Sequence, residues 1–208
     1  PPKDPIGPAY HTLKCEEPVF FHDPGARPGD PGHALHLHRP QGAGRWDNPD
    51  LYDAWYFARS PEGAIGEVFG TFAEWHASMF DTGMPGLRRA MAVFSVPDDL
   101  AVFNFDDAAN LQRIGMRPSD VVIRNKSMTQ RRAVTLFKER NADGSHRWQG
   151  LQWWSYHHPQ WTNLMLWGTR DSPAPLTLRH VEKLELTNIA VEEAARALMR
   201  SLGPVGAP

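Results

Sequence analysis

The first residue whose type and setting could do chemistry is Arg45, in the glycine-flanked segment Gly42-Ala43-Gly44-Arg45-Trp46. Glycines allow the backbone to approach a ligand closely, and a guanidinium can bind a phosphate through two parallel hydrogen bonds. The segment is therefore a candidate phosphate-binding loop. The alternative is a surface turn with a solvated arginine, and the residue types alone leave both open.

Two further polar residues follow, Tyr56 and Glu67. Tyr56 ends an aromatic run that predicts a buried strand, so its hydroxyl either meets a ligand or is satisfied by the backbone. Glu67 lies about 200° around a predicted helix from Ile65, away from the apolar stripe. On periodicity alone Glu67 is a solvated carboxylate, and a functional role needs a second element that covers its face.

Ser155 follows Trp153-Trp154 at the end of a predicted strand. The Gly-x-Ser-x-Gly pattern of a nucleophile elbow does not surround it, so a serine-hydrolase role has little support. The sequence also contains neither a P-loop nor a Gly-x-Gly-x-x-Gly motif, which excludes nucleotide binding by those two devices.

Histidines raise the question of a metal, because His36 and His38 share one face if their segment is extended, with His33 nearby. A zinc site needs three or four ligands, and the single cysteine, Cys15, excludes thiolate-rich sites. His-Glu-x-x-His is absent, and we expect half-exposed histidines and no metal site.

The elements that must position these residues follow from periodicity and from turn residues. Ser60 is a good N-cap and Pro61 suits the first helical position of a helix buried through Ile65, Val68, Phe69 and Phe72. Other predicted helices cover 106–114, 129–139 and 189–202. Predicted strands cover 19–21, 34–38, 54–58, 91–96, 100–105, 150–155, 164–168 and 181–186. Because strands and helices do not alternate regularly, we predict an α+β fold.

Composition bounds the remaining choices. With 208 residues, 41% of them hydrophobic, the chain fits one domain at 18–208 preceded by a Pro-rich arm at 1–17. The net charge of −2 shows no basic excess, so we expect no direct nucleic-acid binding. No apolar run is long enough for a membrane span, and Pro1-Pro2-Lys3-Asp4-Pro5 does not resemble a secretory signal. We expect a cytoplasmic protein.

The order and spacing of the polar residues resemble the RES domain, a family named for its Arg, Glu and Ser. Gly44-Arg45-Trp46-Asp47, Tyr56 eleven residues after the arginine, and Ala64-Ile65-Gly66-Glu67-Val68-Phe69 resemble its first half. Thr129-Gln130-Arg131-Arg132-Ala133, the run from Gly150 to Ser155, and Asn163-Leu164-Met165-Leu166-Trp167 resemble its second half. The resemblance is strongest at 42–69 and 129–168.

The resemblance implies a split mixed β-structure with flanking helices, similar to ADP-ribosyltransferase toxins. Members of the family are toxins of toxin–antitoxin pairs that destroy NAD by hydrolysis or phosphorolysis. Some members ADP-ribosylate a protein instead. The partners implied are NAD, as a substrate and not as a cofactor, and a helix-turn-helix antitoxin of the Xre-like kind. A homo-oligomer stays open.

Carried over to this chain, the resemblance assigns the catalytic roles to Glu67, Arg45 and Tyr56. Arg45 would hold the pyrophosphate or ribose side of NAD, and Tyr56 would orient the nicotinamide. Glu67 would bind the ribose hydroxyls and stabilise the oxocarbenium-like charge as nicotinamide leaves. Ser155 would fix the nicotinamide or ribose by hydrogen bonding, and Trp46 belongs to the same NAD-binding set.

One departure from the family lies near the first predicted strand, where many members carry an arginine. Here the sequence has His22, and Arg27 or Arg39 is expected to supply the charge from the following loop. His22 and Arg39 therefore complete the predicted NAD-binding residues. A neutral histidine binds phosphate less well than arginine does. This departure favours the alternative of a catalytically weak binding module. ADP-ribosyl transfer to a protein is the other alternative, because the sequence does not show which acceptor attacks the ribose.

Overall fold

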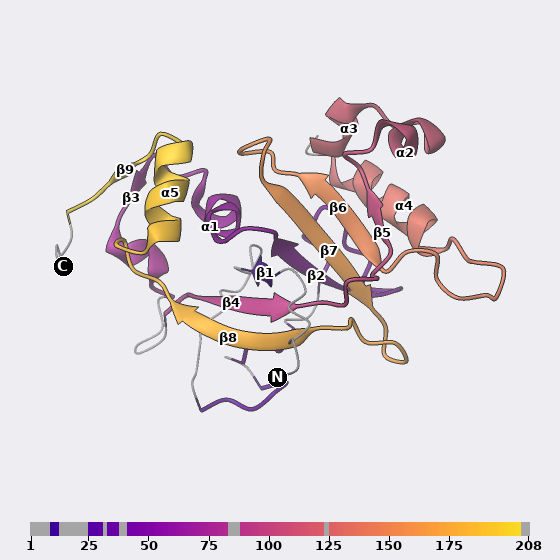
Figure 1. The fold of residues 1–208 in the computed structure, drawn as a ribbon, viewed down its shortest axis with the longest axis horizontal. Helices are drawn as coiled ribbons and strands as arrows, with labels where there is room; N and C mark the ends of the chain where they lie inside the picture. The colour runs from indigo at the N-terminus through magenta and orange to yellow at the C-terminus, as the bar shows by residue number, and fades with distance from the viewer. Residues whose placement is uncertain are drawn as a thin grey trace, which may run out of the picture.

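The computed structural model describes residues 25–30, 33–37, 41–82, 88–122 and 125–204, together with the backbone of 9–12. Within these residues, seven strands form one sheet in the order β5-β6-β7-β2-β1-β4-β8 (Figure 1). Its strands are β1 (Ala9–Thr12), β2 (Asp53–Ala58), β4 (Ala90–Ser95), β5 (Val102–Asn104), β6 (Gly150–Trp154), β7 (Thr162–Gly168) and β8 (Thr177–Lys183). β5 and β6 run parallel and the other neighbours antiparallel, so the sheet is mixed.

Helices lie on one face of this sheet in two groups (Figure 1). One group is α2 (Ala108–Arg113), α3 (Pro118–Val122) and α4 (Lys126–Phe137); the other is α1 (Pro61–Phe69) and α5 (Ile189–Ala197). A short 3₁₀ helix (Ala77–Phe80) and a parallel pair, β3 (Glu74–Trp75) with β9 (Ser201–Leu202), flank the second group. The predicted α+β class, with a mixed sheet and flanking helices, is confirmed.

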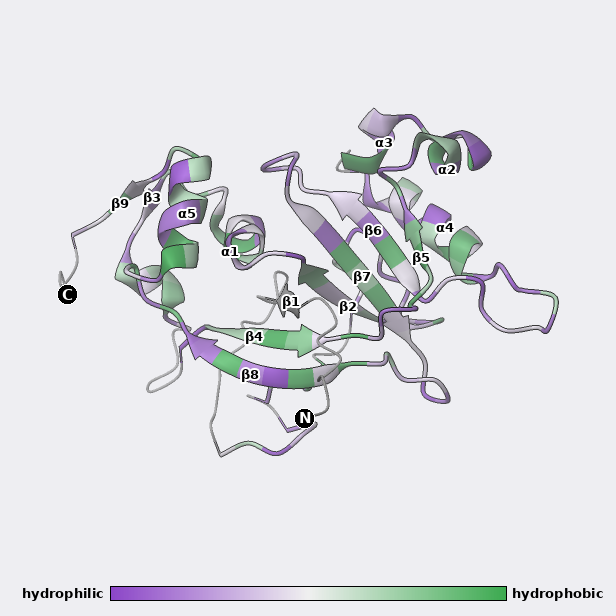
Figure 2. Ribbon diagram, viewed as in Figure 1, coloured by the Kyte–Doolittle hydropathy of each residue, from purple (hydrophilic) through white to green (hydrophobic). Residues whose placement is uncertain are grey.

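The sheet has a buried core on both faces because side chains alternate along each strand. On β7, Met165 packs with the α2–α4 group, whereas Leu164 and Leu166 pack on the opposite face with Phe57 and Phe94. Residues from Asn163 to Gly168 are consequently all buried. β8, at the edge, instead alternates between hydrophobic and hydrophilic residues (Figure 2) and is largely exposed.

The start of α1 is as predicted from sequence. Ser60 has an extended backbone and its Oγ accepts a hydrogen bond from the Gly63 N–H at 3.2 Å, while Pro61 occupies the first turn. Ile65 and Phe69 are fully buried. The predicted apolar stripe includes one residue too many, Phe72. The helix ends at Phe69, and Phe72 lies beyond that end with 49% of its surface exposed.

Other predictions differ from the structure in their boundaries. The helix placed at 129–139 begins at Lys126, after the cap Asn125, and the one placed at 189–202 ends at Ala197. The strand placed at 181–186 begins at Thr177 and ends at Lys183. Part of the arm at 1–17 is an interior strand, because β1 pairs with both β2 and β4.

The predicted strand at 34–38 is wrong for the residues that the structure describes. His33 begins a turn there: its carbonyl accepts from the His36 N–H and its Nδ1 accepts from the Leu35 N–H. His36 bonds through Nδ1 to the Gly29 carbonyl at 2.7 Å. These local bonds compete with a sheet ladder. His38 and the predicted strand at 19–21 lie outside the described residues.

Among the residues that the structure describes, no helix is long and apolar enough to cross a membrane. Nor does that part of the chain bring three His, Cys, Asp or Glu side chains together as a metal-binding group.

Candidate functional site

The glycine-flanked loop at 42–47 closes on Asp47, a residue that the sequence did not single out as functional. Its Oδ2 accepts hydrogen bonds from the Gly42 N–H at 2.9 Å and the Gly44 N–H at 2.8 Å. Gly42 has a φ of 140°, which favours glycine. The Asp47 carboxylate is thus 6% exposed and organises the loop from inside.

Tyr56, on β2, supplies the other contact to this carboxylate. Its hydroxyl donates to Asp47 Oδ1 at 2.6 Å and accepts from the Trp46 N–H at 3.0 Å. Burial, and next the negative charge of Asp47, raise the pKa of Tyr56 well above its ordinary value. The hydroxyl therefore stays protonated and acts as a donor that ties the loop to the sheet.

Arg45 is held between the loop and the α2–α4 group. Its Nη1 donates to the Val121 carbonyl of α3 at 2.8 Å, and its own carbonyl accepts from Thr129 Oγ1 of α4 at 2.6 Å. Gln130 Nε2 adds bonds to the carbonyls of Gly42 and Gly44. The guanidinium is therefore fixed partly by structural contacts, which is more than a solvated turn arginine would show.

Trp46 lies in the core. It is fully buried and stacks on Phe105 with ring centroids 4.9 Å apart, and Trp153 lies 5.6 Å away. With no exposed surface, its ring offers no contact to a ligand in this structure. We therefore place Trp46 beneath the loop and not among the residues that would contact NAD.

Glu67, on α1, is half-buried and meets a partner from the sheet. Asn163 Nδ2 of β7 donates to Glu67 Oε1 at 2.9 Å. The second element that a functional Glu67 required is therefore the start of β7 and the segment before it. Trp161, in that segment, lies so close to Gly66 that a Cβ there would be 2.6 Å from Trp161 Cη2.

Ser155 begins this same segment, at the end of β6. It is 2% exposed, and its Oγ accepts from the His157 N–H at 2.9 Å and the His158 N–H at 3.3 Å. Its N–H donates to the Trp161 carbonyl at 2.7 Å. In this structure Ser155 shapes the turn that carries Trp161 and Asn163, and its assignment to NAD binding stays a prediction.

The sheet register places the two groups of polar residues on one face. Tyr56 pairs with Met165 and Ala58 pairs with Asn163, two positions along the ladder, so Tyr56 and Asn163 project to the same side of neighbouring strands as diagonal neighbours. Ala58 belongs to the core under α1 and α5, whereas Met165 belongs to the core under α2–α4. The candidate site therefore lies where the two helical groups meet the sheet (Figure 1).

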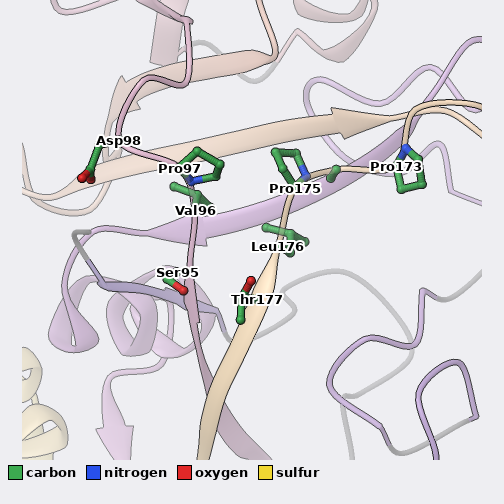
Figure 3. Close-up of a pocket in the computed structure, with 9 residues that line it drawn as sticks. Ser95, Val96, Pro97, Asp98, Pro173, Pro175, Leu176 and Thr177 are labelled. Atoms are coloured by element: carbon green, nitrogen blue, oxygen red, sulfur yellow. The ribbon is translucent and has the colours of Figure 1, made fainter. Parts of the chain in front are cut away.

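Two predicted binding residues, His22 and Arg39, lie outside the described residues. A separate open depression of about 560 Å³ is lined by residues 95–98 and 173–177, with prolines from both segments (Figure 3). It lies at the ends of β4 and β8, and none of the predicted catalytic residues lines it.

Sequence reasoning missed Asp47 and Asn163. The spacing of Asp47, three residues after Gly44, is a signal for a side chain that caps a turn. Asn163 carried a weaker signal, an amide at the start of an otherwise apolar strand. Its partner lies 96 residues away in the chain, so periodicity cannot reveal it.

Comparison with known proteins adds two findings. A family model described as RES domain matches residues 20–188. The fold is similar to a chain of the M. tuberculosis MbcT-MbcA toxin-antitoxin complex, with a TM-score of 0.51 and 18% sequence identity, over 93% of this chain and 89% of that one. No curated protein matches the sequence. At this identity the structural likeness shows the fold alone.

Proposed function

The chain belongs to the RES-domain family, and we propose that it is an NAD-consuming enzyme that breaks the nicotinamide–ribose bond. The observation that supports the proposal most is the half-buried Glu67 carboxylate, held by Asn163 on the sheet face that also presents Tyr56. A carboxylate fixed in partly dehydrated surroundings stabilises a developing positive charge better than one in water.

In the proposed reaction the bond between the ribose anomeric carbon and the nicotinamide nitrogen breaks, and its electron pair leaves with neutral nicotinamide. The ribose gains oxocarbenium-like charge, which Glu67 stabilises while it binds the ribose hydroxyls. Water then attacks the anomeric carbon and loses a proton to solvent, which makes the enzyme a glycohydrolase, or a phosphate oxygen attacks instead, which makes it a phosphorylase. Because the leaving group starts as a cation, no general acid is needed, unlike in the hydrolysis of ordinary glycosides.

Arg45 and Tyr56 complete the proposal. Arg45 would bind the pyrophosphate or ribose side of NAD, and a guanidinium suits that charge. Tyr56 would act mainly through Asp47, by holding the loop that carries Arg45. NAD is the substrate here, and the proposal requires no cofactor.

We further propose that the protein acts as a toxin and is paired with an antitoxin protein. The similar solved structure is that of a toxin-antitoxin complex. The proposal extends that assignment to this chain through the shared fold and the RES family. Expression of the chain should then deplete cellular NAD and slow growth, and normal NAD levels under strong expression would contradict it.

Incubating the purified protein with NAD, with and without phosphate, and separating the products by chromatography tests the reaction. Nicotinamide with ADP-ribose indicates a glycohydrolase, whereas a phosphorylated ADP-ribose formed only with phosphate indicates a phosphorylase. Label from NAD on a protein acceptor indicates ADP-ribosyl transfer. Intact NAD without phosphate, with phosphate and with an added protein acceptor would overturn the proposal and favour a binding module.

Glu67→Ala provides the matched test within this assay, with Glu62→Ala on the first turn of the same helix as the control. We expect nicotinamide release to fall by about 10²–10³-fold in Glu67→Ala, the usual effect of removing one transition-state stabiliser. Glu62→Ala should retain activity, and circular dichroism should show both variants folded. A folded Glu67→Ala variant with full activity would refute the role of Glu67.

A further inference from the structure

Asn163 is a buried amide at the point where the sheet meets α1. The residue is 3% exposed, and its Nδ2 donates to Glu67 Oε1 at 2.9 Å. Carboxamides are seldom buried this fully unless their hydrogen-bonding groups are used. The partner of the Asn163 amide is the Glu67 carboxylate, which stabilises the oxocarbenium-like charge in the proposed reaction.

The backbone around Asn163 is fixed on both sides. In the sheet, Asn163 pairs with Ala58 of β2 and with Trp153 of β6. The helix that carries Glu67 is held against the same segment by Trp161, which leaves no room for a Cβ at Gly66. Donor and acceptor are therefore carried by two rigid elements, and their separation does not depend on a loop.

The amide is only half satisfied. Asn163 Oδ1 is buried and has no hydrogen-bond partner among the described residues. An orphaned buried acceptor destabilises a fold, so an apolar side chain would serve packing alone better. What the amide adds is an N–H aimed at Glu67, and an amide donates that bond without bringing a positive charge to the carboxylate.

We propose that Asn163 is a positioning residue that holds the Glu67 carboxylate in the orientation needed to stabilise the ribose cation. The inference rests on the proposed NAD cleavage. Asn163 acts through Glu67 and needs no contact with NAD. A neutral donor suits this task, because a cation paired with the carboxylate would cancel the field that the reaction uses.

The test is the isosteric variant Asn163→Asp, whose carboxyl group has the shape of the amide but replaces its neutral N–H donor with a second carboxyl that repels Glu67 or competes with it for a proton. We expect kcat for nicotinamide release to fall about 100-fold, because misplacing a reacting or stabilising group by about 1 Å has that effect. The KM for NAD should change less than about threefold, since Glu67 acts mainly as the bond breaks. In a Glu67→Ala background, Asn163→Asp should cause no further loss.

Asn104→Asp is the matched control, because Asn104 also lies on a strand and uses its Oδ1 as an acceptor, from the Asp106 N–H and Gln152. A carboxylate can replace that acceptor, so activity should be retained. A loss in Asn163→Asp that appears equally in KM, or that persists in full in the Glu67→Ala background, would overturn the inference.

A thermal-unfolding cycle of wild type, Glu67→Ala, Asn163→Ala and the double variant tests the contact without any activity. The two stability effects should be non-additive, because the residues share one hydrogen bond. Additive effects would overturn the inference even if the wild type cleaves NAD. If the wild type releases no nicotinamide, the proposed function fails, and the cycle alone decides whether Asn163 holds Glu67.

Discussion

Replacing Gly66 with alanine should destabilise the protein, although alanine is the better helix former. The position lies inside α1 and faces Trp161, which is 6% exposed. A Cβ would meet Cζ3, Cη2 and Cε3 of the Trp161 six-membered ring, the last at 3.0 Å. The ring is buried against the helix, so either the ring or α1 must move to accommodate one methyl group.

The magnitude follows from two opposing effects. Overpacking a well-packed site usually costs about 1–3 kcal/mol, and contact with three ring atoms places this variant near the upper end. The change from glycine to alanine in a helix stabilises the folded state by about 1 kcal/mol. The net loss is therefore about 2 kcal/mol, which for 208 residues corresponds to a decrease in Tm of about 5 °C.

The background Trp161→Leu makes the test sharp, because leucine lacks all three ring atoms that the Cβ would meet. Trp161→Leu should itself cost about 2 kcal/mol through the cavity that it leaves. In that background, Gly66→Ala should be neutral or stabilising by up to about 1 kcal/mol. Urea unfolding at constant m-value measures each step. Equal destabilisation by Gly66→Ala in both backgrounds would refute this account of the α1 contact.

Two other predictions concern buried or partly buried charges. Tyr56→Phe should lower the free energy of unfolding by about 2 kcal/mol, because the Asp47 carboxylate loses a charge-assisted hydrogen bond; an unchanged urea midpoint would contradict it. For Glu139, partial burial raises its pKa, but hydrogen bonds from Arg113 and Trp148 outweigh this and hold the pKa below its ordinary value. A carboxyl whose pKa is lower in the folded than in the unfolded protein stabilises the fold at pH values above its unfolded pKa, and this stabilisation is lost as the pH falls through its folded pKa. Glu139→Gln should therefore lower the free energy of unfolding by about 1 kcal/mol at pH 7 and by progressively less below about pH 4. A difference in stability that stays constant from pH 7 to pH 3 would exclude this linkage.

Much of the local structure could be predicted from the sequence because it depends on neighbouring residues. Ser60 and Pro61 specify the start of α1, since a cap and a fixed φ act within one turn. The aromatic run around Tyr56 predicted β2, and the apolar run 164–168 predicted most of β7. The ends of elements were predicted less accurately, because tertiary contacts decide where an element stops. The predicted strand at 181–186 was shifted toward the C-terminus, and the predicted helix at 189–202 was too long.

Fold class and family also followed from the sequence. Irregular mixing of strands and helices predicted α+β, and the motifs around Arg45 and Glu67 predicted the RES family. The strand at 34–38 was wrong because alternation in the sequence does not show that His33 would bond to the backbone of a turn. Such local bonds depend on the path of the backbone, and the alternation of residue types along the sequence does not describe that path.

The partners in the candidate site were decided only by the tertiary structure. Periodicity predicted a solvated Glu67, because it describes the faces of one helix only. The partner of Glu67, Asn163, is placed beside it by the pairing of β7 with β2. The family resemblance placed Trp46 among the NAD-binding residues, but packing against Phe105 and Trp153 buries it completely. Residue types and spacing thus determined which side chains could do chemistry. Which of them meet, and which are enclosed in the core, depends on contacts between distant segments that form only when the sheet and both helical groups assemble.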